Sequence, residues 1–195
     1  MLERLTRMQF AVVSVVGAFA VAGAIAAILV AATIGFGWYN TAADVPHMPM
    51  VAWLLHRTMI RSVKAHAQQD APRQFSSQQV QQGFAEFEEH CVMCHGGPGV
   101  ARAKWVMGLE PTPPYLVDAA RRWSPGELRY IISHGVKMTA MPAWHFSQSQ
   151  EDLTSLVAFL EALPNISTKQ YAAMRAQAQE ARRQGEDGPQ PVEHP

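Results

Sequence analysis

The chain has 195 residues, and its 16 lysines and arginines balance its 16 aspartates and glutamates, so the formal net charge is zero. This length fits one ordinary domain with accessory segments, and the neutral charge gives no indication of nucleic acid or of a strongly charged partner. The average composition hides a segregated sequence, because a long apolar run near the N-terminus precedes an ordinarily polar remainder.

The first predicted element is a membrane-spanning helix over residues 10–37, preceded by a short N-terminal segment over 1–9. No residue from 10 to 36 is charged, and this run would form roughly 40 Å of helix, whereas a bilayer core requires about 30 Å. A secretory signal peptide cleaved near residues 41–43 is the alternative, but its apolar region is normally about 7–15 residues. Arg4 and Arg7 favour a cytoplasmic N-terminus. We therefore expect a single-pass anchor.

Residues 38–75 are predicted to be a linker that contains an amphipathic helix over 49–67. Apolar residues recur there at helical spacing, and basic residues occupy much of the rest. The apolar positions are Val51, Leu54, Leu55, Met59, Ile60 and Val63, and the basic ones are His56, Arg57, Arg61 and Lys64. Such a helix can lie on anionic headgroups, dock on another subunit or pack on its own domain. The sequence leaves these three placements open.

The chemistry is carried by Cys91-Val92-Met93-Cys94-His95, which contains both cysteines of the chain. C-x-x-C-H is the attachment signature of c-type haem. A disulfide would close too short a loop to add much stability, and a zinc site would need a second ligand pair that the chain lacks. A thioredoxin-like redox pair competes, but no βαβ pattern surrounds it. We therefore predict one haem c, covalently bound through Cys91 and Cys94, with His95 as an iron ligand.

Residues 76–165 resemble the class I cytochromes c, and with the anchor they are similar to cytochrome c subunits of bacterial respiratory complexes. Gly83, Phe87 and Cys91 recur at four-residue spacing, as in that family's N-terminal helix, where the glycine permits a close crossing with the C-terminal helix. Ser76 or Ser77 can cap this helix, and an apolar pattern over 147–163 matches the closing helix. The resemblance implies an all-α fold, with an N-terminal transmembrane helix followed by a small class I cytochrome c helical domain.

The resemblance also implies two further cofactor-binding residues. The Pro98 carbonyl, in the turn-rich loop after His95, would accept a hydrogen bond from the His95 ring, a contact that fixes the orientation of an iron ligand. Met141, which precedes Pro142 in a segment similar to the family's distal loop, would supply the sixth iron ligand. A residue before proline is displaced toward extended backbone, which favours such a loop.

Other residues downstream of the attachment site could compete with Met141 for the iron. Met138 follows a predicted helix over 125–134 and is interpreted as packing. Met107, His134 and His145 are the remaining candidates. Beyond Pro164, residues 166–195 are predicted to form a helix with a poor apolar face and then a mobile polar tail.

An iron bound by histidine and methionine has no open coordination position, so we expect electron transfer and predict no catalytic residue. The expected function is that of a membrane-anchored mono-haem cytochrome c on the periplasmic face of a bacterial inner membrane. The expected partners are redox proteins, or the other subunits of a respiratory-chain oxidoreductase complex. Small residues on one face of the anchor, Ala18, Ala22 and Ala26, favour packing against a partner helix. A freely tethered electron shuttle, and a haem enzyme or gas sensor in which Met141 is displaced, stay open as alternatives.

Overall fold

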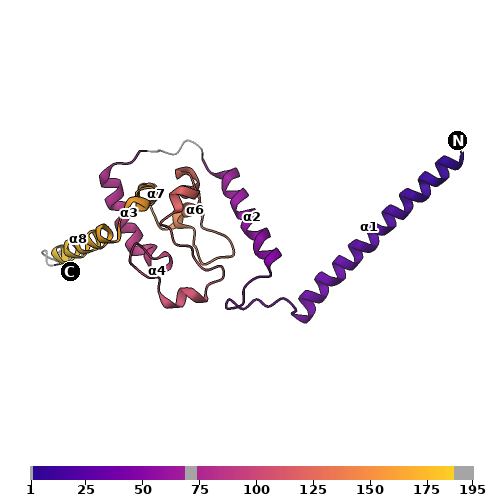
Figure 1. Cartoon of the computed structure of the whole chain (residues 1–195), viewed down its shortest axis with the longest axis horizontal. Helices are drawn as coiled ribbons and strands as arrows, with labels where there is room; N and C mark the ends of the chain where they lie inside the picture. The colour runs from indigo at the N-terminus through magenta and orange to yellow at the C-terminus, as the bar shows by residue number, and fades with distance from the viewer. Residues whose placement is uncertain (1, 69–73, 187–195) are drawn as a thin grey trace, which may run out of the picture. The chain divides into compact units, whose positions relative to one another are not determined.

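A computed structural model describes residues 2–68 and 74–186 of the chain (Figure 1). Within these residues the secondary structure is helical, apart from an isolated bridge between Gly97 and Val100. The predicted all-α fold is therefore confirmed. The chain divides into two compact units, Met1–Val45 and Pro46–Pro195, and each is described by itself. Most of the predicted mobile tail, from residue 187 on, lies outside the described residues.

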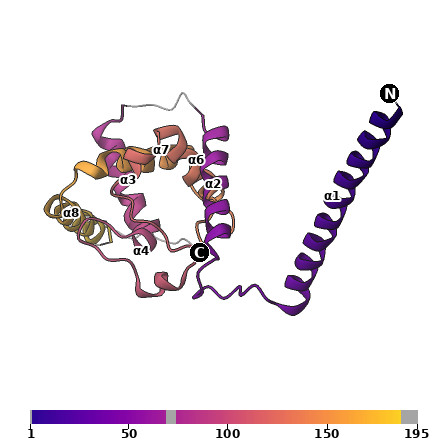
Figure 2. The ribbon, with the colours of Figure 1, turned by 45° about the vertical axis from the view of Figure 1, so that its right-hand side comes forward.

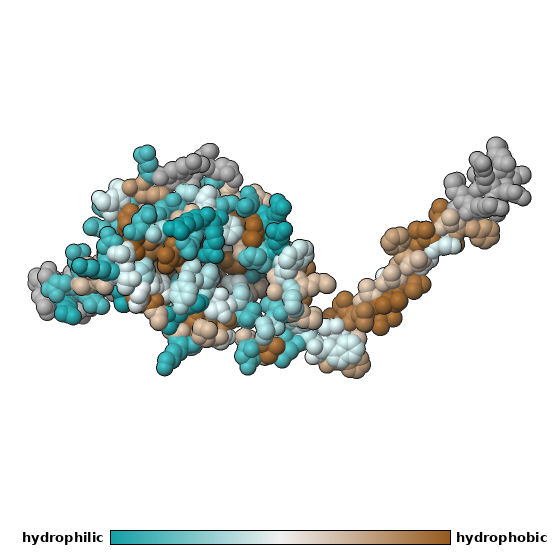
Figure 3. Space-filling model, in the orientation of Figure 1, coloured by the Kyte–Doolittle hydropathy of each residue, from teal (hydrophilic) through white to brown (hydrophobic). Residues whose placement is uncertain are grey.

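The first unit is dominated by α1 (Leu2–Phe36). Its stretch Gln9–Phe36 is long and apolar enough to cross a membrane, because 28 residues rise about 42 Å. Its large apolar side chains are exposed, and Figure 3 shows the helix as a mostly brown, apolar rod. The length and composition fit the predicted anchor, and a signal sequence near the N-terminus would satisfy the same criterion.

The second unit is a group of short helices, several of which begin at a serine. The hydroxyls of Ser76, Ser124 and Ser149 each accept the backbone N–H of the residue three positions later, whose side chain binds back to the serine N–H. These capping boxes satisfy backbone donors that a helix start leaves unpaired. The helices are α2 (Pro49–His66), α3 (Ser77–His90), α4 (Val92–His95), η1 (Lys104–Gly108), α5 (Ala119–Arg122), α6 (Pro125–His134), η2 (Trp144–Phe146), α7 (Gln150–Ala162), η3 (Leu163–Asn165) and α8 (Thr168–Glu186).

The core of this unit lies where α3 crosses α7 (Figures 1 and 2). At the crossing a Cβ on Gly83 would lie 1.8 Å from the backbone oxygen of Ser155, so only glycine permits this approach. Phe87 and Phe159 are fully buried beside it, with ring centroids 5.0 Å apart. The close helix crossing that the Gly83 spacing predicted is present.

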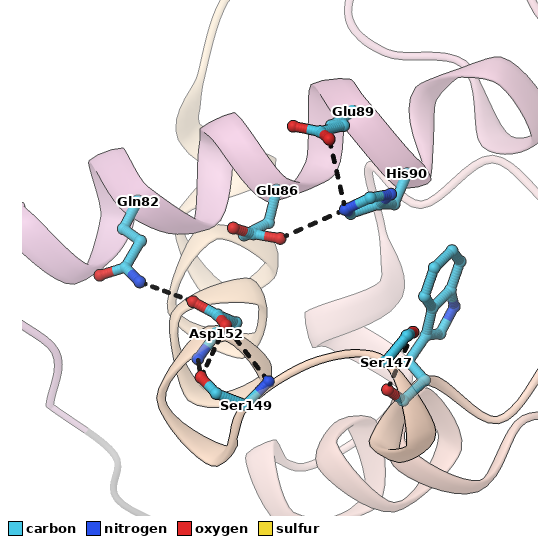
Figure 4. A network of polar contacts seen from close by, with 8 residues as sticks. Gln82, Glu86, Glu89, His90, Ser147, Ser149 and Asp152 are labelled. Carbon is cyan, nitrogen blue, oxygen red and sulfur yellow. Dashed lines mark hydrogen bonds and ion pairs between the residues drawn. The ribbon is translucent and has the colours of Figure 1, made fainter. Parts of the chain in front are cut away.

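A row of polar side chains closes one side of the same crossing (Figure 4). The Gln82 amide on α3 donates to the Asp152 carboxylate on α7 at 2.8 Å, and Asp152 also accepts the hydroxyl of Ser149 at 2.6 Å. The hydrogen bond from Ser149 is the main reason why the pKa of Asp152 is lowered. One turn along α3, burial raises the pKa of Glu86, which lies 3.6 Å from His90. Among these contacts, the hydrogen bond from Gln82 to Asp152 joins α3 to α7.

Helix α2 packs beside α6 in both views of the ribbon (Figures 1 and 2). Val63 and Ala67 are buried, and the ring of His66 stacks on Tyr130 of α6 with centroids 6.0 Å apart. Trp53 and Leu54, in the N-terminal half, are 60% and 56% exposed. The apolar stripe predicted in the linker over 38–75 is therefore divided, because only its C-terminal half packs on the rest of the second unit.

Helix α8 packs against α3 and the loop after His95. Its sequence predicted a poor apolar face, and this packing was not expected. Tyr171 is fully buried, and its hydroxyl donates to Glu88 of α3 at 2.5 Å. Arg175 pairs with the same carboxylate at 2.6 Å. The Tyr171 ring also contacts Gly97, where a Cβ would lie 2.6 Å from the phenol. Tyr171 thus connects α8 both to α3 and to the loop after His95.

Candidate functional site

The C-x-x-C-H sequence forms one tight helical turn directly after α3. The N–H of Cys91 still donates to Phe87, as the last bond of α3, at 2.9 Å. The carbonyl of Cys91 then accepts the N–H groups of Cys94 and His95 at 3.1 and 2.9 Å. This turn presents two thiols and an imidazole within five residues, on a backbone held by the core helix.

Both cysteines are partly buried and neither forms a disulfide. Burial is the main cause that raises the pKa of Cys91 to about 12, with smaller contributions from Cys94 and Glu86. Reactive redox thiols have the opposite property, a lowered pKa in an electropositive and accessible setting. Among the described residues no group of three or more His, Cys, Asp or Glu side chains could hold a metal ion. The raised pKa of Cys91 therefore disfavours a thioredoxin-like redox pair.

His95 is buried, and its Nδ1 lies 2.7 Å from the carbonyl oxygen of Pro114. A carbonyl oxygen only accepts, so Nδ1 carries the proton and Nε2 keeps its lone pair. Burial lowers the pKa of His95, although the hydrogen bond to Pro114 partly opposes this, and the nearby Arg102 lowers it further. His95 is thus held as a neutral imidazole with a defined tautomer, the form in which histidine binds a metal.

The acceptor predicted for His95, the carbonyl of Pro98, is wrong. Pro98 lies inside a tight turn that closes on itself, because Gly97 and Val100 exchange two hydrogen bonds of 3.0 and 2.9 Å. The acceptor comes from Pro114, nineteen positions after His95. Sequence resemblance located the contact in the loop next to His95, whereas the fold brings a later segment to the ring.

Arg102 holds this later segment in place. Its guanidinium donates to the carbonyl of Pro113 and lies 3.9 Å from the centroid of the Tyr115 ring. The Tyr115 ring covers Gly96, where a Cβ would lie 2.9 Å from the ring, and Gly96 has a φ of +66°. A glycine is therefore required beside His95 both by the backbone conformation and by the close approach of the ring. Arg102 and Tyr115 were missed in the sequence because nothing local distinguishes them.

The predicted distal loop turns Met141 inward and Met138 outward. The Met141 N–H donates to the Thr139 hydroxyl at 3.1 Å, and that hydroxyl donates to the carbonyl of Val136 at 2.7 Å. Met141 is half-buried against the core cluster, on which Cys91 and Val92 also pack. Met138 is 72% exposed and has a φ of +62°, so the interpretation of Met138 as a packing residue is wrong.

The other candidate ligands lie in less suitable positions. Met107 is largely exposed. His134 and His145 are exposed, with ring centroids 5.3 Å apart, and Nδ1 of His145 lies 2.7 Å from the carbonyl oxygen of Ser133. By contrast, Cys91 and Met141 share one apolar cluster, and Nε2 of the buried His95 has no hydrogen-bond partner in the described part of the chain. The donor set of two thiols, one imidazole and one thioether fits a covalently bound haem.

Comparison with known proteins supports this interpretation. Residues 78–160 match the family model described as cytochrome C oxidase, cbb3-type, subunit III. The matched segment begins in α3 and ends in α7, so it contains the attachment turn, the Pro114 segment and the Met141 loop. A search of curated proteins found no match to the chain.

Proposed function

We propose that this chain, whose residues 78–160 form a class I c-type cytochrome domain, is a mono-haem electron carrier anchored in a bacterial inner membrane. Its haem domain would lie on the periplasmic side, as part of a respiratory-chain oxidoreductase complex. The observation that carries the proposal is the geometry at His95. A buried, neutral imidazole follows the two thiols, with Nδ1 held by Pro114 and Nε2 left for a metal.

Different residues of this site would have different roles in binding a haem. Cys91 and Cys94 would bind it covalently, and His95 Nε2 and the Met141 thioether would bind its iron. When bound, haem c supplies a one-electron redox couple. The hydrogen bond from His95 to Pro114 orients the ring and increases its basicity as a ligand. With both His95 and Met141 bound to it, the iron would have no position left for substrate or oxygen, and methionine ligation would raise the reduction potential.

The proposal of a membrane anchor and the proposal of a complex are supported by different features of the chain. Helix α1 has the length and composition of a membrane span, and covalent haem attachment belongs to the periplasmic side in the family that the domain resembles. Ala18, Ala22 and Ala26 lie on one face of α1, and small residues at this spacing permit close packing of a partner helix. These features support a fixed subunit rather than a cytochrome that moves alone.

Ligation is tested by replacing the two methionines of the distal loop. Met141→Ala should abolish the thioether-to-iron absorption band of the oxidised protein and allow carbon monoxide to bind the reduced protein at neutral pH. Met138→Ala is the matched control, three residues away and exposed, and should change neither property. Met141→His should retain six ligands and lower the potential, within the roughly 0.8 V range that axial ligands control.

Two outcomes would contradict the proposal. If Met138→Ala alone removes the band, the assignment of Met141 is wrong. If the full-length chain, extracted in mild detergent, is recovered without co-purifying proteins and migrates alone, then the subunit proposal fails and the freely tethered shuttle takes its place.

A further inference from the structure

Helix α2 packs on its own unit only through the C-terminal half of one side, and its other large apolar side chains are exposed. At about 100° per residue, Met59, Ile60 and Val63 lie on the side that packs toward α6, and each is buried or half-buried. Met50 and Leu54, on the other side of the helix, are 75% and 56% exposed, and Trp53, at the edge of the packed side seven residues before Ile60, is 60% exposed. Three large apolar side chains at spacing i, i+3 and i+4 thus form an outward apolar patch of residues 50, 53 and 54.

Basic side chains continue this outward face along the helix. Arg57, Arg61 and Lys64 follow the apolar patch on the same side and are all exposed, and residues 49–66 contain no aspartate or glutamate. A shallow, open hollow runs beside them, lined mostly by apolar atoms of the surrounding side chains. Its lining residues are Arg57, Thr58, Arg61, Ser62 and His66. Of these residues, Arg57 and Arg61 offer hydrogen-bond donors and positive charge, the chemistry that binds a phosphate group.

We propose that the outward face of α2 lies on the surface of an anionic phospholipid bilayer. Met50, Trp53 and Leu54 would enter the boundary between headgroups and acyl chains, and the exposed Arg57 and Arg61 would bind a headgroup phosphate. Tryptophan is enriched at this boundary because one end of its ring system is apolar and the other is polar. A face that combines large apolar residues with basic ones is typical of helices that lie in the membrane interface.

The inference rests on the proposed anchoring by α1, which also favours lipid over a protein as the occupant. Residues 37–48 connect the end of α1 to the start of α2, and twelve residues extend at most about 42 Å. An anchor that spans the bilayer therefore keeps α2 near the headgroups. Since the other face of α2 packs on α6, docking of α2 would also limit the directions in which the haem domain can face the membrane.

The test uses the full-length, haem-loaded chain alone in lipid nanodiscs, with the haem reduced. A nitroxide label is attached at Leu54→Cys, in the outward patch, or at the matched control His56→Cys, an exposed position about 200° further around the same helix. In discs containing phosphatidylglycerol, the label at 54 should collide with oxygen more than with a water-soluble nickel complex, and the label at 56 should show the reverse. In phosphatidylcholine discs, with or without inorganic phosphate, the difference should largely disappear.

The contribution of the basic residues to membrane docking is tested by adding Arg57→Gln and Arg61→Gln to the Leu54→Cys chain. Each basic residue near an anionic surface contributes about 1 kcal/mol, so the ratio of docked to undocked label should fall about 25-fold for the pair. Equal accessibility at positions 54 and 56 in anionic discs would overturn the inference. So would a label at 54 that is exposed to water in the discs and becomes immobile only in the purified complex, since a protein would then be the partner. A chain that does not enter discs at all identifies failure of the anchor instead.

Discussion

The helix crossing at Gly83 can be tested by a single methyl group. Gly83→Ala would place a Cβ 1.8 Å from the backbone oxygen of Ser155, 2.4 Å from its carbonyl carbon and 2.9 Å from Cβ of Phe159. Two of these atoms belong to the backbone of α7, so rotation of a side chain does not relieve the clash. Ordinary contact needs about 3.5 Å, so α3 and α7 would have to separate locally by roughly 1.7 Å.

Two opposing effects set the size of the change. Inserting a methyl group into a well-packed core costs about 1–3 kcal/mol, occasionally more, and this clash with backbone belongs near the upper end. Alanine is favoured over glycine inside a helix by about 1 kcal/mol, which offsets part of the cost. The expected net loss is about 2 kcal/mol, so the steric effect exceeds the gain in helix propensity.

The measurement is thermal unfolding of the haem-loaded chain, followed by circular dichroism in detergent. A loss of about 2 kcal/mol should lower Tm by roughly 8 °C for a domain of this size. Gly108→Ala is the matched control, because a Cβ there meets no atom within 4 Å, and its effect should stay within about 0.5 kcal/mol. If Gly83→Ala unfolds at or above the temperature of the wild-type protein, the close crossing of α3 and α7 is refuted.

Two further predictions concern buried polar groups of α7 and α8. Burial raises the pKa of Glu161, whose Oε1 has no hydrogen-bond partner in the described structure. Because the pKa of Glu161 in the folded state lies above its unfolded value, the penalty for burying the charge is present at pH 7 and disappears as the pH falls below the unfolded pKa of 4.5. Glu161→Gln should therefore stabilise the protein at pH 7, by less than about 1 kcal/mol, and have almost no effect near pH 4; equal effects in urea unfolding at the two pH values would contradict this. Tyr171→Phe removes the hydroxyl that donates to Glu88 but leaves Arg175 paired with it, so stability should fall by about 1–2 kcal/mol. Tyr115→Phe, at an exposed tyrosine, is the control, and equal stability of the two variants would refute the role of the buried hydroxyl.

Several features of the site were readable from the sequence because they depend on neighbouring residues. The attachment turn consists of five consecutive residues, and the serine caps act over three. Gly83 and Phe87 lie on one helix face at a spacing that the family resemblance identified. Helix α6 begins and ends where its pattern predicted, at Pro125 and His134. In each case the backbone geometry is determined within one or two turns of helix.

Only the tertiary structure decided the features that depend on contacts between segments distant in sequence. Pro114 rather than Pro98 accepts the His95 hydrogen bond, because Arg102 and Tyr115 hold a loop against the attachment turn. Tyr171 becomes a fully buried core residue from a helix that looks polar in sequence. The single apolar stripe of α2 is divided between a packed half and an exposed half. Burial and long-range hydrogen bonds are properties of neighbours in space, whereas a sequence pattern reports only neighbours along the chain.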